Sequence, residues 1–288
     1  MKQIGRYRLD SVHGVGAFAT VWRGWDIDLE SPVAIKILAD NWVHHSDVRR
    51  RFLEEARILR QIIDPRIVRV LDVGVAEDRP YFVMDFLAGG TLADRIGHVS
   101  TGEARSLAVE SARAVHALHD HDVLHRDIKP ANLLVHNGHV LISDLGSAKR
   151  LVESSGFTLT TGSPSYMAPE QATGGPLDER CDVYSLGVLA YELLTGRLPF
   201  EHPLTREPQD RPPPTGLGSG VDRVLADAMA PRVAARTHSA AAFADSLART
   251  SLTPAPLWRR AVRPAATVAG MTFCGSASYL AVTYLFYR

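Results

Sequence analysis

The chain has 288 residues, of which 45% are hydrophobic and 22% charged, so one large bilobed domain or two smaller domains with a packed core are expected. The formal net charge is zero at pH 7, which gives no support to nucleic-acid binding, because that function usually needs a clustered basic excess. The two cysteines, Cys181 and Cys274, are far apart, which argues against a disulfide framework and fits a reducing compartment.

Short apolar segments rich in β-branched and aromatic residues dominate the N-terminal third. They predict three antiparallel strands between Tyr7 and Leu38 and two more strands over Ile67–Val73 and Pro80–Asp85. Between these groups, Asp47–Ile63 carries apolar residues at helical spacing on one face and charged residues on the other, which predicts an amphipathic helix. The N-terminal part should therefore contain five strands and one main helix.

After the pair Gly89-Gly90, which looks like a hinge, the pattern is mostly helical. A short hairpin is predicted around Asn137-Gly138, and the Pro- and Gly-rich run Glu201–Gly220 should be irregular. The predicted helices are Gly102–His121, Asp182–Thr195, Val221–Ala230 and Ser239–Leu247.

The stretch His125–Asn132 gathers several polar side chains between two apolar segments. It contains Asp127, Lys129 and Asn132, and Pro130 excludes an ordinary helix interior. A loop fixed between buried segments in this way can hold a carboxylate base, a phosphate partner and a metal ligand in one place.

Three other motifs carry little weight alone. Gly14 and Gly16 would let backbone amides approach a polyphosphate, although glycine pairs are common in hairpins. Lys36 stands in an otherwise buried strand and needs an anionic partner, for which Glu55 is the candidate, although a lysine at a strand end is usually solvated. Asp144 follows an apolar strand and could face a metal ion.

The order of these motifs along the chain is more specific than any one of them. From the N-terminus they are the Gly-rich turn, Lys36, Glu55, the loop with Asp127, Asp144-Leu145-Gly146, Ala168-Pro169-Glu170 and Asp182. In this order they resemble the eukaryotic-like Ser/Thr protein kinase family found in bacteria, over residues 7–247. Lys129 within the loop is typical of the Ser/Thr rather than the Tyr branch.

The resemblance implies an α+β fold with two lobes, a five-stranded β N-lobe with one main helix and a mostly α-helical C-lobe. We expect the N-lobe over residues 1–87, the C-lobe over 88–249, a juxtamembrane linker over 250–263 and a transmembrane helix over 264–287. The implied reaction transfers the γ-phosphoryl group of ATP, with Mg²⁺ or Mn²⁺, to a Ser or Thr hydroxyl of a protein substrate.

The resemblance also implies a role for the motif residues. Lys36, oriented by Glu55, would hold the α- and β-phosphates. Asp127 would accept the proton of the substrate hydroxyl, and Lys129 would neutralise the transferred phosphoryl group. The implied metal ligands are Asn132 and Asp144. The residues implied to bind the nucleotide are Gly14, Val15, Gly16, Ala17, Phe18, Val21, Ala34, Lys36, Glu55, the gatekeeper Met84, and Asp85 and Leu87 in the hinge.

Other implied roles are structural. Asp182 would anchor the backbone of the catalytic loop, and Glu170 would form a buried ion pair with Arg236. An internal apolar spine would contain His125, Leu145 and Leu59.

The same resemblance points to regulation by phosphorylation. Arg126 would receive a phosphorylated residue of the activation loop, and we expect autophosphorylation at one or more of Thr158, Thr160 and Thr161. The hydroxyl of Ser163 would meet the catalytic Asp and Lys.

Four positions depart from the family pattern. Ala19 replaces the third glycine of the loop, and its added methyl group should weaken ATP binding at most. Leu145 replaces a phenylalanine and Ser163 replaces a threonine, and both keep the chemical character. The segment between Phe200 and Val221 is short, so the helix usually found there should be shortened or missing.

The alternative interpretation is a pseudokinase that acts as a membrane-bound binding scaffold.

No charged side chain occurs between Arg263 and Arg288. A helix there would be about 36 Å long, enough to cross a bilayer core, although a buried core helix and a peripheral anchor are alternatives. By the positive-inside rule, the arginines before it place the kinase in the cytoplasm and the C-terminus outside the cell membrane, in a single pass. Small residues recur every four positions and suggest a homodimer face; they are Ala266, Gly270, Cys274 and Ser278.

Overall fold

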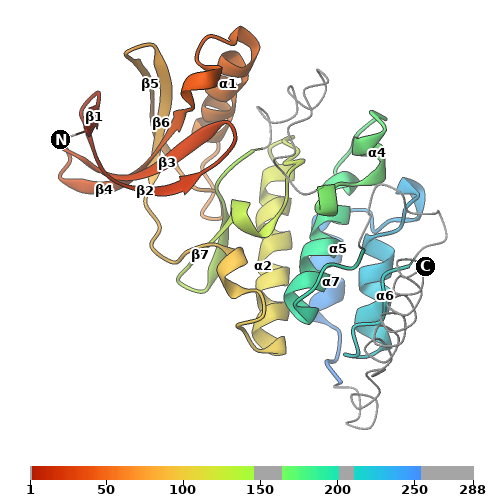
Figure 1. Cartoon of the computed structure of the whole chain (residues 1–288). Coiled ribbons are helices and arrows are strands. Elements are labelled where there is room, and N and C mark those ends of the chain that lie inside the picture. The colour runs from red at the N-terminus through yellow and green to blue at the C-terminus, as the bar shows by residue number, and fades with distance from the viewer. Residues whose placement is uncertain (1, 146–163, 201–210, 254–288) are drawn as a thin grey trace, which may run out of the picture.

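The computed structural model describes residues 2–145, 164–200 and 211–253. The chain forms two lobes (Figure 1), with a β-sheet and helix α1 (Ser46–Gln61) at one end and a group of helices around α5 (Arg180–Thr195) at the other. This is the predicted α+β arrangement of two lobes.

The N-lobe sheet has six antiparallel strands in the order β1-β2-β3-β4-β6-β5. The prediction of five strands was wrong, because β1 has only three residues and two of them are polar, too few to show an alternating pattern. Strand β1 pairs with β2, and the paired residues Ile4 and Tyr7 have buried side chains. The strands are β1 (Lys2–Ile4), β2 (Tyr7–Val15), β3 (Ala19–Asp26), β4 (Ser31–Leu38), β5 (Val70–Ala76) and β6 (Arg79–Asp85).

Helix α1 lies against strands β5 and β6 through one face. Residues on that face recur at spacings of three and four, as an amphipathic helix requires. The face consists of Val48, Phe52, Glu55, Ala56 and Leu59. Glu55 is its one charged member and is 1% exposed, so the helix carries a carboxylate into the interior of the lobe.

Strand β5 begins later than predicted, because the segment before it turns to the other lobe. Ile67 forms a parallel bridge with Ile142, the last residue of β8 (His139–Ile142). Backbone hydrogen bonds run from the Val68 amide to the Ile142 carbonyl (2.8 Å) and from the Ile142 amide to the Arg66 carbonyl (2.9 Å). The residues that follow α1 are thus tied to the C-lobe.

The connection between the lobes is closely packed at Gly89 and Gly90. A Cβ atom at Gly89 would lie 1.7 Å from the carbonyl oxygen of Val135 on β7 (Leu133–His136). Gly90 has a φ of +74°, and its carbonyl accepts a hydrogen bond of 3.0 Å from the Val135 amide. The two glycines therefore allow a close crossing of two backbones.

The C-lobe contains further helices and a hairpin besides α5. They are α2 (Thr101–His119), the hairpin of β7 and β8, α4 (Pro169–Ala172), α6 (Ser219–Ala228) and α7 (Ala240–Ala248). Helix α5 contacts α2, α6 and α7, and every residue from Cys181 to Tyr191 is buried, as expected from its apolar sequence. Asp182, in its first turn, is a fully buried carboxylate within that apolar helix.

Several predicted features lie outside the described residues. They are Thr158, Thr160, Thr161, Ser163 and the candidate membrane segment 264–287. Across residues 2–145, 164–200 and 211–253, no helix combines the length and apolar character needed to cross a membrane. Residues 211–218, just before α6, form no helix.

Candidate active site

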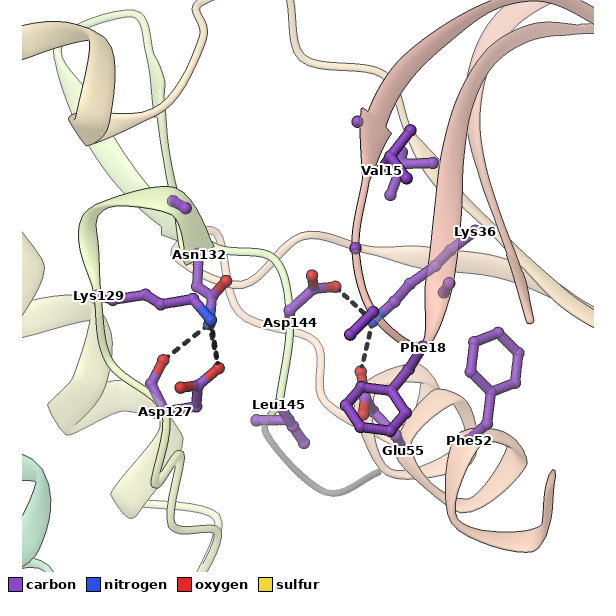
Figure 2. Close-up of a pocket in the computed structure, with 16 residues that line it drawn as sticks. Val15, Phe18, Lys36, Phe52, Glu55, Asp127, Lys129, Asn132, Asp144 and Leu145 are labelled. Carbon is purple, nitrogen blue, oxygen red and sulfur yellow. Dashed lines mark hydrogen bonds and ion pairs between the residues drawn. The ribbon is translucent and has the colours of Figure 1, made fainter. Parts of the chain in front are cut away.

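A cavity of about 300 Å³ opens between the two lobes. The turn between β2 and β3 lies on its N-lobe side, and the loop after α2 and the segment after β8 lie on the other (Figure 2). The cavity is lined by Gly14, Val15, Gly16, Ala17, Phe18, Ala19, Val21, Lys36, Phe52, Glu55, Asp127, Lys129, Ala131, Asn132, Asp144 and Leu145. The fold thus brings together the polar side chains that the sequence singles out from both lobes.

Lys36, on β4, faces two carboxylates. Its Nζ lies 3.0 Å from Oε1 of Glu55 and 2.9 Å from Oδ1 of Asp144 (Figure 2). Burial alone would lower the pKa of Lys36, but the charges of Asp144 and Glu55 outweigh burial and raise this pKa above its ordinary value. Burial raises the pKa of Glu55 to about 7 against the effect of Lys36, because one ammonium is shared by two carboxylates away from water.

Asp127 is held by two neighbours in its own loop. Its Oδ2 lies 2.7 Å from Nζ of Lys129 and accepts a hydrogen bond of 3.0 Å from Nδ2 of Asn132. The same Nδ2 donates to the Asp127 carbonyl at 2.7 Å, which leaves the side-chain oxygen of Asn132 as the atom able to bind a cation. The Asp127 side chain is 17% exposed, so a substrate hydroxyl can reach it.

The β7–β8 hairpin brings Asn132 and Asp144 together. Asn132 directly precedes β7 and Asp144 follows β8 after Ser143, and the terminal residues of the two strands, Leu133 and Ile142, pair in register. Ser143 donates from its amide (3.2 Å) and from its hydroxyl (3.1 Å) to the Asn132 carbonyl. Two side chains with oxygen ligands are thereby fixed at one end of the hairpin.

Asp182 fixes the backbone of the loop that carries Asp127. Its two carboxylate oxygens accept hydrogen bonds from the amides of His125 (2.8 Å) and Arg126 (2.7 Å). His119, at the end of α2, places its Nε2 2.8 Å from the same carboxylate, a partner that sequence reasoning missed. Burial alone would raise the pKa of Asp182, but these hydrogen bonds and the histidine lower it.

Glu170 and Arg236 form the predicted ion pair through two contacts of 2.6 and 3.1 Å. The Arg236 side chain is fully buried, and it also donates to the carbonyls of Arg180 (2.7 Å) and Ala230 (3.0 Å). Its guanidinium lies 5.1 Å from the ring centre of Tyr184 on α5. One arginine therefore joins α4, α5 and the segment before α7.

The residues predicted to form an apolar spine, His125, Leu145 and Leu59, are all buried. Leu59 and Leu145 belong to one hydrophobic cluster. Burial lowers the pKa of His125, and its Nδ1 accepts a hydrogen bond of 3.3 Å from the Asp127 amide, so the ring is neutral with its proton on Nε2.

The Gly-rich turn is closed by a hydrogen bond of 2.9 Å from the Gly16 amide to the Ala19 carbonyl. The amides of Ala17 and Phe18 donate to no other described residue, and both residues line the cavity. They are therefore available to an anion such as a phosphate. Ala19 is 5% exposed, has no positive φ and belongs to the hydrophobic core, so strand β3 accommodates its methyl group.

A second cavity of about 260 Å³ shares part of its wall with the first. Five of the residues predicted to bind the nucleotide line it, namely Val21, Ala34, the gatekeeper Met84, and Asp85 and Leu87 of the hinge. Phe86, within the predicted hinge of residues 85–87, also lines it. His13, which begins the Gly-rich stretch, and Thr91 line it too and were not among the predicted nucleotide contacts. The rings of His13 and Phe86 meet edge to face, with centres 5.5 Å apart.

Asn132 and Asp144 offer oxygen ligands, which Mg²⁺ and Mn²⁺ prefer. Within the part of the chain that the structure describes, no group of three or more His, Cys, Asp or Glu side chains could hold a metal ion. Magnesium usually keeps several waters and binds through one or two carboxylates and the phosphates of a substrate. The two residues therefore fit an ion that binds together with a nucleotide.

The sequence matches the protein kinase domain family over residues 7–212. It is 34% identical to the serine/threonine-protein kinase pkn2 of Myxococcus xanthus, with 88% of this chain and 35% of that protein covered. It is 38% identical to the serine/threonine-protein kinase PrkC of Bacillus subtilis, with 68% and 31% covered. The chain thus spans about a third of the length of these relatives.

Solved structures agree with these matches. The crystal structure of the Mycobacterium tuberculosis PknI kinase domain superposes with a TM-score of 0.68 at 25% identity, covering 86% of this chain and 96% of that one. The chain therefore belongs to the protein kinase family, among the eukaryotic-like Ser/Thr kinases of bacteria.

Proposed function

We propose that this chain is a serine/threonine protein kinase that transfers the γ-phosphoryl group of ATP to hydroxyl groups of proteins. The observation that carries the proposal is the partly exposed Asp127 carboxylate, held by Lys129 and Asn132 in the same cavity as Lys36 and Asp144. The Asp127 carboxylate can act as the base, and the ammonium groups of Lys129 and Lys36 in the same cavity supply the positive charge that phosphoryl transfer needs. The names of the relatives support a protein as the acceptor.

In the proposed reaction, the substrate hydroxyl gives its proton to Asp127 as its oxygen attacks the γ-phosphorus. The bond between that phosphorus and the β,γ-bridging oxygen breaks, and ADP leaves with the electron pair. Lys129, 2.7 Å from the base, balances the charge of the transferred group. Lys36 holds the α- and β-phosphates, and the amides of Ala17 and Phe18 face the phosphate chain.

Two residues would hold a divalent metal ion, Asn132 through its side-chain oxygen and Asp144 through its carboxylate. When bound, such an ion neutralises charge on the phosphates. Asp144 also contacts Lys36 at 2.9 Å, so one carboxylate positions both the lysine and the metal site. Glu55 holds the lysine from its other side.

Replacement of the base tests the proposal. Asp127→Asn should lower transfer from labelled ATP to a protein acceptor by about 10²- to 10⁴-fold, because no carboxylate remains to take the proton. The matched control is Asp122→Asn, an exposed residue of the same segment whose φ of +58° asparagine adopts equally well. An Asp127→Asn variant that transfers phosphate at the wild-type rate would overturn the assignment.

The alternative is a pseudokinase that binds nucleotide and serves as a scaffold. The presence of Lys36, Asp127, Asn132 and Asp144 in one cavity favours an enzyme. The wild-type protein decides between the two in the same assay, because a pseudokinase would bind ATP and transfer nothing.

We further propose that the kinase phosphorylates itself at one or more of Thr158, Thr160 and Thr161. Arg126 is an exposed residue of the catalytic loop, and a phosphate with nearly two negative charges is a strong partner for a guanidinium. The hydroxyl of Ser163 would face the catalytic residues. Mass spectrometry should find phosphate on these threonines in the wild type and not in Asp127→Asn; unmodified threonines in active protein would remove the idea.

We also propose that residues 264–287 anchor the kinase in the cell membrane as one helix, with the catalytic lobes in the cytoplasm. The support is an uncharged run preceded by Arg259, Arg260 and Arg263. Alkaline carbonate should leave the full chain in the membrane pellet, whereas a peripheral anchor would be released.

Small residues every four positions along this segment support a homodimer through close helix contact. Gly270→Leu should then weaken self-association of the full chain in membranes. Association equal to that of the wild type would count against the dimer.

A further inference from the structure

Trp42 contacts the tip of the Gly-rich turn from outside the cavity. It ends the short 3-10 helix Asp40–Trp42 between β4 and α1, and it is 8% exposed. Its indole N–H donates a hydrogen bond of 2.9 Å to the Ala17 carbonyl. Its ring packs on that of Phe18, with centres 5.3 Å apart and planes 32° apart.

These contacts determine the direction of the Phe18 backbone N–H at the tip of the turn. A trans peptide is planar, and its C=O and N–H point in opposite directions. Because Trp42 fixes the Ala17 carbonyl, it also fixes the direction of the Phe18 amide, which belongs to the same peptide unit. A second bond of 2.9 Å, from the Ala39 amide to the Phe18 carbonyl, holds the next unit.

Trp42 also contacts the start of helix α1. Its carbonyl accepts a hydrogen bond of 3.0 Å from the His45 amide, and its ring meets the His45 ring at 5.8 Å, edge to face. The His45 carbonyl in turn accepts the Arg49 amide of α1. One side chain therefore connects the turn above the phosphate site with the helix that carries Glu55.

We infer that Trp42 is a positioning residue that holds the Gly-rich turn closed over the phosphate site and links its position to that of α1. This inference rests on the proposed function, because it assigns the turn to nucleotide phosphates. Trp42 touches no reacting atom and acts through Ala17 and Phe18. Its loss should therefore affect ligands with phosphates and spare those without.

The test compares binding of ADP and of adenosine, each with Mg²⁺, by calorimetry on the full chain. Trp42→Phe keeps an aromatic ring against Phe18 and removes the N–H donor. It should weaken ADP binding by about three- to tenfold, the effect of one hydrogen bond, and leave adenosine binding within about twofold. The control is Trp25→Phe, a partly buried tryptophan on β3 that does not line the cavity and should change neither affinity.

A second variant approaches the same contact from the turn. Phe18→Leu removes the ring partner at a half-buried position and should also weaken ADP selectively. Because the two side chains touch, the double variant should lose less than the product of the two single effects. Independent effects that multiply would contradict the link. If the Trp42 variant fails to fold, Phe18→Leu alone still tests the contact, and unchanged ADP binding by that variant would contradict it.

The outcomes separate this inference from the proposed function. A wild type that binds ADP no better than adenosine would overturn both. A wild type that prefers ADP, beside a Trp42→Phe variant that binds ADP equally well, would overturn only the role of Trp42. Equal losses for ADP and adenosine would show a general structural role and would also overturn it.

Discussion

Lys36 and Glu55 form an ion pair of 3.0 Å between β4 and α1, in which the Glu55 side chain is buried. Glu55→Gln should lower phosphate transfer at least about tenfold, because an amide cannot orient the lysine by charge. The control is Glu54→Gln, one position along α1 and 55% exposed. Equal activity of both variants in the labelled-ATP assay would show that the pair has no role in catalysis.

The same carboxylate makes stability depend on pH. Its folded pKa is raised by burial from 4.5 to about 7, so the stability it contributes is fully present below about 4.5 and is lost as pH rises through about 7. Relative to Glu55→Gln, the wild type should therefore lose thermal stability between pH 5 and pH 8. Unfolding temperatures of both proteins across that range check the sign, and a constant difference between them would refute the assigned shift.

Asp182→Asn should destabilise the fold by about 2–4 kcal/mol, because an amide brings a donor toward the buried amides of His125 and Arg126. Asp178→Asn, at a side chain that is 46% exposed and paired with Arg180, should cost less than about 1 kcal/mol. Denaturant unfolding of the two variants gives the comparison. Similar losses of unfolding free energy for both variants would contradict a specific stabilising role of the Asp182 carboxylate.

Gly89→Ala should destabilise the junction of the lobes strongly, because its methyl group would lie 1.7 Å from the Val135 carbonyl oxygen. Gly102→Ala, inside α2 with nothing within 4 Å of the added carbon, should be neutral or stabilising by up to about 1 kcal/mol. Thermal unfolding of the pair distinguishes a packing constraint from the general effect of removing a glycine. A tolerated Gly89→Ala would indicate that β7 can shift.

Contacts between motif residues could be predicted from sequence. The Lys36–Glu55 pair and the Glu170–Arg236 pair each join residue types with opposite charge, and the family order says which ones meet. Long helices such as α5 were also predictable, because their apolar pattern is continuous.

Other contacts leave no local signal. His119 is an ordinary residue of an Ala-rich helix until the fold brings it to Asp182, 63 positions away. Asp144 meets Lys36 across 108 positions, and Trp42 looks like any buried aromatic residue. Strand β1 is too short to show a periodic pattern. The residues after α1 join the C-lobe through backbone hydrogen bonds, which do not depend on the side chains and so leave no pattern in the sequence. Only the tertiary arrangement reveals these partners.

The burial of Ala19 bears on how kinase sequences are sorted into active and inactive sets. A rule that demands three glycines in the turn would place this chain among the inactive ones. Here the third position is the first residue of β3, paired with Leu38, and a methyl group fits there among core side chains. The residue type at this third position therefore reflects how strand β3 begins. The side chains that line the cavity are a better guide to whether such a chain can catalyse phosphoryl transfer.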